Sequence, residues 1–183
     1  MSVRVIAGTA KGHRLHVPRG ITIRPTPDRA KEGLFNALGD RVVDSKFLDL
    51  YAGSGAIGIE ALSRGAAAAE FVEMRAHVAR IIERNLRRTA LTERGRVVVA
   101  PTEEALRRLA SESKTFDIIF ADPPYKSRKA LEILQVLGSK QLLNEEGLVV
   151  WERASGTGFP DAVGKLHCLK ELRYGDTSFA FLS

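Results

Sequence analysis

The stretch Phe47-Leu-Asp-Leu-Tyr-Ala-Gly-Ser-Gly-Ala-Ile-Gly-Ile-Glu-Ala-Leu62 decides the fold, because it passes from an apolar strand through a Gly-x-Gly turn into residues at helical spacing. We expect the strand to end at Asp49 to Tyr51 and the helix to begin near Ala56. Gly53 and Gly55 let the backbone pass close to a ligand, and the N–H groups at the helix start can meet a carboxylate or a hydroxyl. No Gly-Lys-Ser or Gly-Lys-Thr follows, so the turn is not a P-loop.

An acid stands on each side of this turn, at the ends of two successive strands. Asp49 repels phosphate but suits a cationic ligand, and S-adenosylmethionine carries an ammonium group and a sulfonium. The next strand, residues 67–72, closes on Glu73, which lies 24 residues beyond Asp49. In strand-helix-strand nucleoside sites, an acid about 20 residues further along binds the ribose hydroxyls. The two acids together indicate a nucleoside cofactor, although a solvated glutamate at a strand end remains the alternative.

The segment Phe116-Asp-Ile-Ile-Phe-Ala-Asp-Pro-Pro-Tyr125 reads as a strand that stops abruptly. A Pro-Pro pair cannot donate to a strand ladder, so it fixes Asp122 and Tyr125 just past the strand's end. The aspartate and the adjoining backbone carbonyl can accept hydrogen bonds from an exocyclic amine, and the tyrosine ring can stack on a base. The pattern therefore indicates a grip for a flat, amine-bearing ring, with a plain strand and proline-rich turn as the alternative.

The rest of the chain alternates strands and helices. The expected strands cover residues 3–6, 14–17, 96–100, 147–151, 166–174 and 178–182, and the expected helices cover residues 27–38, 77–89, 103–110 and 130–137. Thr26 and Thr102 are expected to cap the helices that follow them, and residues 156–164 to form a flexible connection. The pattern predicts an α/β fold with a mostly parallel sheet and a C-terminal antiparallel hairpin. We expect residues 1–23 to form a β-hairpin extension and residues 24–183 the main domain.

Composition excludes several classes of protein. With 183 residues, 44% of them hydrophobic, the chain suits one globular domain, and no apolar run approaches the roughly 18 residues of a membrane span. The start lacks a signal-peptide pattern, so a cytoplasmic location is expected. Cys168 is the only cysteine, which excludes an intrachain disulfide or a cysteine-based zinc site and favours a buried role. His13 and His16 lack companion ligands at metal-binding spacing, so no metal is expected.

The net charge of +6 is concentrated at one end of the chain. Residues 1–31 hold seven Lys or Arg and one acid, so they carry the whole excess, and the remainder is neutral. A local basic excess on a neutral domain is what a phosphate backbone requires, although a merely solvated basic surface is the alternative. The residues expected to contact nucleic acid lie at the hairpin tip, at the start of the first helix and in the loop after Tyr125. They are Lys11, His13, Arg14, Arg24, Arg29, Lys126 and Arg128.

The order of these segments resembles the class I S-adenosylmethionine-dependent methyltransferases, which have a Rossmann-like fold. Asp122-Pro-Pro-Tyr125 is similar to the sequence of their amino-methylating subset. Matches along nearly the whole chain resemble the bacterial small-subunit (16S) ribosomal RNA guanine-N2 methyltransferases of the RsmD family. The matching segments are Ile6-Ala-Gly8, Lys11-Gly-His-Arg-Leu15, Arg24-Pro-Thr-Pro-Asp-Arg29, Leu34-Phe-Asn36, Leu48-Asp-Leu-Tyr-Ala-Gly-Ser-Gly-Ala56, Glu60-Ala-Leu-Ser-Arg64 and Tyr174-Gly-Asp176.

The resemblance implies S-adenosylmethionine as cofactor and small-subunit ribosomal RNA or the small subunit as partner. The oligomeric state is left open, with a monomer favoured. The residues implied to bind the cofactor are Asp49, Tyr51, Gly53, Ser54, Gly55, Glu73, Met74 and Thr102. The residues implied to hold the guanine are Asp122, Pro123, Pro124 and Tyr125. Two positions depart from the family: Arg75 stands where a smaller or acidic residue is common, and Pro101 stands where a polar partner of adenine is common. The second departure leaves Thr102 or backbone groups to contact adenine.

The implied reaction is direct methyl transfer to the guanine amine, with no metal or covalent intermediate. The target guanine must be unstacked to enter the site, which suits an RNA loop better than a closed duplex. The alternatives are another amino-methyltransferase, acting on DNA adenine-N6 or protein glutamine-N5, and a methyltransferase-like fold that only binds RNA. The chain has no extra segment large enough for a DNA base-recognition domain, and it retains the acids and the Asp-Pro-Pro-Tyr segment that a non-catalytic protein is expected to lose.

Overall fold

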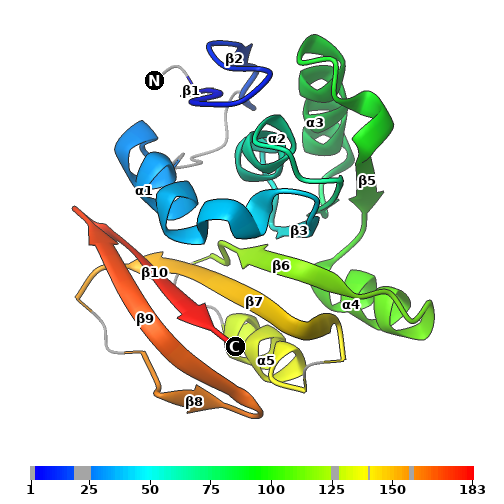
Figure 1. The fold of residues 1–183 in the computed structure, drawn as a ribbon. Helices are drawn as coiled ribbons and strands as arrows, with labels where there is room; N and C mark the ends of the chain where they lie inside the picture. Colours follow the sequence, from blue (N-terminus) through cyan, green and yellow to red (C-terminus); the bar gives the residue numbers. More distant parts are fainter. Residues whose placement is uncertain (1–2, 19–25, 125–127, 140, 157–158) are drawn as a thin grey trace.

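The computed structural model describes residues 3–18, 26–124, 128–139, 141–156 and 159–183. Within them, eight strands form one mixed sheet in the order β5-β4-β3-β6-β7-β10-β9-β8 (Figure 1). Five strands are parallel: β3 (Lys46–Leu50), β4 (Ala68–Glu73), β5 (Gly95–Val99), β6 (Phe116–Ala121) and β7 (Leu143–Ala154). The antiparallel part comprises β8 (Ala162–Val163), β9 (Leu166–Tyr174) and β10 (Thr177–Leu182). The expected fold class is confirmed.

Helices cover both faces of the sheet. The first face carries α1 (Asp28–Leu38), α2 (Ala56–Ser63) and α3 (Ala76–Arg88), and the second carries α4 (Thr102–Ser111) and α5 (Arg128–Leu137). Two short 3-10 helices, η1 (Gly39–Val42) and η2 (Thr92–Arg94), follow α1 and α3. Side chains alternate across each strand, so Phe47 packs toward α1 and α2 while Leu48 packs toward the other face. Two cores therefore share one sheet.

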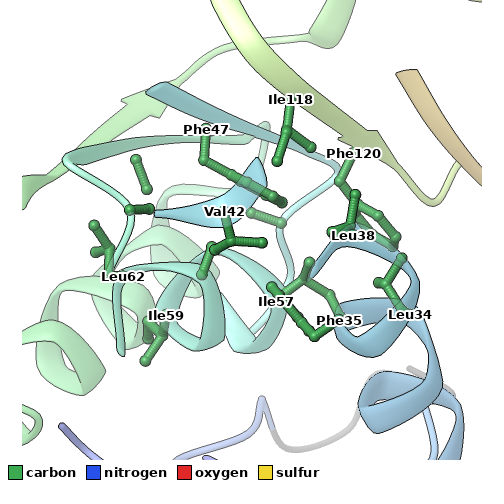
Figure 2. Packing of buried hydrophobic residues seen from close by; sticks show 14 of the residues in the cluster. Leu34, Phe35, Leu38, Val42, Phe47, Ile57, Ile59, Leu62, Ile118 and Phe120 are labelled. Atoms are coloured by element: carbon green, nitrogen blue, oxygen red, sulfur yellow. The ribbon is translucent and has the colours of Figure 1, made fainter. Parts of the chain in front are cut away.

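The core on the first face is built from aromatic and aliphatic side chains of α1, α2, β3 and β6 (Figure 2). Phe35 from α1 and Ile57 from α2 lie together below Phe47 and Ile118 of the sheet. The hairpin of β1 (Val3–Arg4) and β2 (Arg14–Leu15) adds Val3 to the same cluster. The hairpin is therefore packed onto the main core rather than suspended from it.

The hairpin strands are shorter than the expected residues 3–6 and 14–17. The cause lies in α2, because the Glu60 carboxylate accepts the Ile6 N–H at 2.8 Å and the Ala7 N–H at 3.0 Å. These amides therefore bind a side chain instead of a strand partner. Glu60 stands in an otherwise apolar helical run, which is the signal in the sequence for such a buried contact.

Four other expectations were wrong in detail. Neither threonine caps a helix: Pro27 and Pro101 hold the cap positions of α1 and α4, without a side-chain cap bond. The strand expected at 147–151 extends over Leu143–Ala154, because Leu143 pairs with Phe116 of β6 and β10 pairs with Val149 to Ala154. The connection expected at 156–164 contains β8. Cys168 is only partly buried, because it lies on β9 near the open edge of the sheet.

Candidate cofactor and substrate site

Three acids lie at the carboxyl edge of three adjacent parallel strands. Glu73 ends β4, Asp49 is the penultimate residue of β3, and Asp122 directly follows β6, in the sheet order β4-β3-β6. Because parallel strands end at the same edge, residues far apart in sequence are brought together there. The edge thus gathers negative charge around the Gly-x-Gly turn that joins β3 to α2.

Asp49 is buried and faces the start of α2. Its Oδ2 accepts the Gly58 N–H at 2.9 Å, so one of the N–H groups at the start of the helix is already bonded within the protein. Burial, the largest cause, acts with the charges of Asp122 and Glu73 to raise the pKa of Asp49 to about 7, against the opposing Gly58 hydrogen bond. A cation placed at this edge would relieve the repulsion between the carboxylates.

Glu73 supports the glycine turn from the neighbouring strand. Its Oε2 accepts the Gly53 N–H at 3.2 Å, and its Oε1 accepts both the backbone N–H and the Nε–H of Arg75 at 3.0 Å. Gly53 and Gly55 have φ of +56° and +77°, a region that favours glycine. Arg75, which departs from the family pattern, is therefore the ion-pair partner of Glu73.

Tyr51, Thr102 and Met74 lie around the same edge. Tyr51 has φ of +62°, an uncommon conformation for a residue with a side chain. Burial raises the pKa of its hydroxyl, and the side chain of Thr102, at the start of α4, opposes that shift. Met74 is 66% exposed and directly follows Glu73, which pairs in register with Val99, another exposed apolar residue. Exposed apolar groups beside a buried carboxylate suit a flat ring attached to a polar sugar.

The expected grip for an amine follows β6. Asp122 is partly buried and Pro123 buried, whereas Pro124 is exposed. Burial raises the pKa of Asp122 to about 7. Tyr125 and Lys126 fall outside the described residues, so their expected roles remain predictions. The structure thus brings the Asp122-Pro pair to the same edge as the cofactor-binding candidates.

Sequence reasoning missed a fourth acid near this edge. Glu152 is buried on β7, one position beyond Trp151, which pairs in register with Ala121 at the end of β6. Its Oε2 accepts the hydroxyl of Thr26 at 2.9 Å. The threonine expected to cap α1 therefore anchors the start of that helix to the sheet. The Glu in Trp-Glu-Arg carries no distinguishing signal, since strand-end acids are usually solvated.

The basic residues are distributed over two elements. Lys11, His13 and Arg14 are exposed on the hairpin, and Arg29 is exposed on the first turn of α1. The Arg4–Asp28 ion pair, with Nε and Oδ2 2.9 Å apart, joins the two elements. Arg24 lies outside the described residues, and the structure describes only the backbone of Arg128, in α5.

Lys31, counted in the basic excess, is not a surface charge. It is buried, with its Nζ 2.5 Å from the Arg4 carbonyl oxygen and 3.4 Å from Glu60 Oε2. Burial lowers the pKa of Lys31, and Glu60 opposes that shift. Its helical position beside Ala30 and Leu34 does not distinguish it from an exposed lysine, so sequence alone could not place it.

The described part of the chain contains neither a metal-binding cluster nor a membrane-spanning helix. No group of three or more His, Cys, Asp or Glu side chains is arranged to hold a metal ion there. No described helix is both long enough and apolar enough to cross a membrane.

The chain is similar in sequence to known proteins over most of its length. The family described as conserved hypothetical protein 95 matches residues 3–183. YlbH of Bacillus subtilis (strain 168), named provisionally as an rRNA methyltransferase, is 38% identical over 178 residues, or 97% of each chain. Ribosomal RNA small subunit methyltransferase D of Escherichia coli (strain K12) is 38% identical over 158 residues, which cover 86% of this chain and 78% of that protein.

Solved structures agree with the sequence matches. Hypothetical protein TTHA0928 of Thermus thermophilus superposes with a TM-score of 0.84 and 32% identity, covering 98% of both chains. SMU.776, a methyltransferase-type structure in complex with S-adenosylhomocysteine (SAH), has a TM-score of 0.64 and 16% identity over 80% of this chain and 48% of that one. At that identity the second match supports the fold alone.

Proposed function

The chain belongs to the family that includes RsmD and YlbH, among the class I S-adenosylmethionine-dependent methyltransferases, and from this premise we propose that it methylates the exocyclic N2 amine of a guanine in small-subunit (16S) ribosomal RNA. The observation that carries the proposal is the set of three acids at one sheet edge, Asp49, Glu73 and Asp122, around the glycine turn. Two of them flank the turn, and the third leads into Pro123.

The residues at the edge fit S-adenosylmethionine. Asp49 and the turn at Gly53 to Gly55 would hold the cationic methionine end, because burial among carboxylates favours a positively charged partner. Glu73 would accept the ribose hydroxyls with the lone pairs that Gly53 and Arg75 leave unused. The backbone of the turn and the side chains of Met74 and Thr102 would complete the contacts expected with the cofactor.

The substrate amine would be held by Asp122 and Pro123. The bound cofactor supplies an electrophilic methyl group, which the amine nitrogen gains as it loses one proton and S-adenosylhomocysteine leaves. A guanine amine is a poor nucleophile because its lone pair is delocalised into the ring. Hydrogen bonds from this amine to the Asp122 carboxylate and the Pro123 carbonyl would favour a pyramidal nitrogen aimed at the methyl group, with Tyr125 stacked on the base.

The RNA contact is proposed for the first part of the chain. Residues 1–23 would act as an RNA-binding extension of the domain formed by residues 24–183. Lys11 and Arg14 are exposed on the hairpin, and no ion pair to either is found among the described residues. Such side chains can neutralise backbone phosphates and bring a loop guanine to the site.

The decisive test combines product mapping with one substitution. Labelled S-adenosylmethionine is incubated with unmodified small subunits, naked 16S rRNA, DNA and a glutamine-containing protein substrate, and the methylated residue is identified. We expect N2-methylguanosine in rRNA only, and loss of methylation by about 100-fold or more in Asp122→Asn with cofactor binding retained. Methylation of DNA adenine or of glutamine, or a wild-type rate in the variant, would contradict the proposal.

The pH profile of the same reaction reports on Asp122. Its raised pKa means that the carboxylate acceptor is present above about pH 7 and is lost as the pH falls through 7. We therefore expect the single-turnover rate with cofactor and RNA saturating to rise with pH around 7. The Asp122→Asn variant should lack the part of this rise that belongs to Asp122. An unchanged profile in the variant would assign the titration to another group.

A further inference from the structure

Asn85 lies on the inward side of α3, and its side chain is fully buried. A buried amide requires hydrogen-bond partners, and this one has three. Its Oδ1 accepts the His16 N–H at 2.8 Å, and its Nδ2 donates to the His16 carbonyl and to the Ser54 carbonyl, both at 2.9 Å. One side chain therefore joins the segment after β2 to the glycine turn, although His16, Ser54 and Asn85 are far apart in sequence.

The glycine turn needs external support. Two of its residues, Gly53 and Gly55, occupy the left-handed region, where an unsupported glycine-rich backbone has many alternatives. Glu73 fixes the turn from one side by accepting the Gly53 N–H. Asn85 fixes the next residue from the other side through the carbonyl of Ser54. The two contacts set the direction of the peptide groups that would face the cofactor.

We propose that Asn85 is a positioning residue for S-adenosylmethionine, which holds the glycine turn in its binding conformation and links that conformation to the docked N-terminal hairpin. The inference rests on the proposed cofactor site and adds a residue that does not touch the cofactor. Since the amide contacts the hairpin segment and the turn at once, ordering of either one favours the other.

Ser63 provides a matched control. It is a buried polar residue that also binds the hairpin: its Oγ accepts the Ala10 N–H at 2.9 Å and donates to the Ala7 carbonyl at 2.6 Å. It lies at the far end of α2 from the glycine turn. Loss of Ser63 Oγ should therefore loosen the hairpin as Asn85 substitution does, but leave the turn in place.

The first experiment measures the affinity for S-adenosylhomocysteine by calorimetry, without RNA, in the wild type, Asn85→Ala, Asn85→Asp and Ser63→Ala. Asn85→Asp keeps the volume and the acceptor for the His16 N–H but, when ionised, loses both donors. We expect about five- to tenfold weaker binding in both Asn85 variants, the size expected for one hydrogen bond, and less than about a twofold change in Ser63→Ala. Equal losses in Asn85→Ala and Ser63→Ala, or no loss in Asn85→Ala, would overturn the inference.

A second experiment needs no variant. Amide hydrogen exchange of the wild-type protein is compared with and without S-adenosylhomocysteine. We expect exchange at the His16 amide to slow several-fold on binding, and exchange at the Ala10 amide to stay unchanged, because Asn85 connects only the former to the turn. Unchanged exchange at His16 would contradict the link. If the wild type failed to bind the ligand at all, the proposed cofactor site would be wrong instead.

Discussion

At the scale of single residues, Asp49 illustrates a conflict between stability and binding. Its pKa is raised from 3.8 to about 7, so between these values the folded protein binds a proton that the unfolded chain releases. The contribution of Asp49 to the free energy of unfolding therefore falls as the pH rises from about 4 to 7. Above pH 7 the buried carboxylate destabilises the folded protein. A buried charge of this kind is retained where it serves a ligand.

We expect Asp49→Asn to raise the free energy of unfolding at pH 8 by roughly 1–3 kcal/mol, because the amide oxygen can still accept the Gly58 N–H without the cost of burying a charge. The gain should shrink toward pH 4, and affinity for S-adenosylmethionine should fall. Urea unfolding at pH 8 and pH 5 measures the first effect, and calorimetry the second. Asp40→Asn, at an exposed site on η1, is the control. Lower stability of Asp49→Asn than of wild type at pH 8 would contradict the argument.

At the scale of elements, two helical glycines allow a matched comparison. A Cβ on Gly58 in α2 would lie 2.3 Å from Cε1 of Phe71, which is fully buried on β4. A Cβ on Gly33 in α1 would lie 2.0 Å from Cζ of Tyr174, but that contact is with the far end of a half-buried side chain that can swing aside. Close packing of α2 on the sheet therefore depends on Gly58 more strictly than packing of α1 depends on Gly33.

We expect Gly58→Ala to lower the free energy of unfolding by about 1–3 kcal/mol, because overpacking against Phe71 outweighs the helix propensity gain of about 1 kcal/mol. Gly33→Ala should lie within about 1 kcal/mol of wild type, with the Tyr174–Phe179 ring contact, now 6.2 Å between centroids, weakened. Urea unfolding of the two variants in parallel gives the answer. If the Gly58→Ala protein were as stable as Gly33→Ala, Phe71 on β4 would have to shift aside more easily than its close packing indicates.

The contact between the hairpin and α2 depends on a buried charge cluster. Glu60 accepts two backbone amides of the hairpin loop, and it also pairs with Arg64 Nε at 2.8 Å and with Lys31. Removal of Glu60 leaves these donors and a buried ammonium without a carboxylate. Removal of the Lys31 charge leaves Glu60 with Arg64 and both amides, so the two partners are not equivalent.

We expect Glu60→Leu to cost about 3–5 kcal/mol of unfolding free energy and Lys31→Met clearly less, roughly 1–2 kcal/mol, since methionine fills a similar volume. Amide exchange at Ile6 and Ala7 should accelerate strongly in Glu60→Leu and only modestly in Lys31→Met. Chemical denaturation and hydrogen exchange measure the two effects. A Lys31→Met protein as unstable as Glu60→Leu would show that the cluster acts as one indivisible unit.

At the scale of the whole molecule, the exposed bases of the hairpin lie on the face of α1, α2 and α3, and α4 lies on the opposite face. If RNA phosphates bind the hairpin, Lys11→Ala and Arg14→Ala should each weaken rRNA binding and reduce the slope of log affinity against log salt by about 1. Arg107→Ala, which removes an exposed base from α4, should leave both unchanged. Filter binding over a series of salt concentrations measures the rRNA affinity and its salt dependence. An equal loss of affinity in all three variants would indicate non-specific attraction of RNA to basic residues and contradict a contact at the hairpin.

Much of this architecture could be predicted from the sequence, because its patterns are local. The strand ending in Ala121, the turn at Gly53 to Gly55 and the terminal hairpin all follow from periodicity and turn residues. The burial of Lys31, the three contacts of Asn85 and the bond between Thr26 and Glu152 could not be predicted in this way. Each depends on residues brought together only by the complete sheet.

The docking of the hairpin also has a consequence for the order in which the protein forms during synthesis. The hairpin leaves the ribosome before Glu60, Ser63 and Asn85, which hold it through contacts that span 53 to 69 residues of sequence. At roughly 5–20 residues per second, the 69 residues from His16 to Asn85 take about 3–14 s to be added. During that interval this basic segment lacks its final partners, so the hairpin is made before the residues that hold it and can be fixed only after Asn85 has been added.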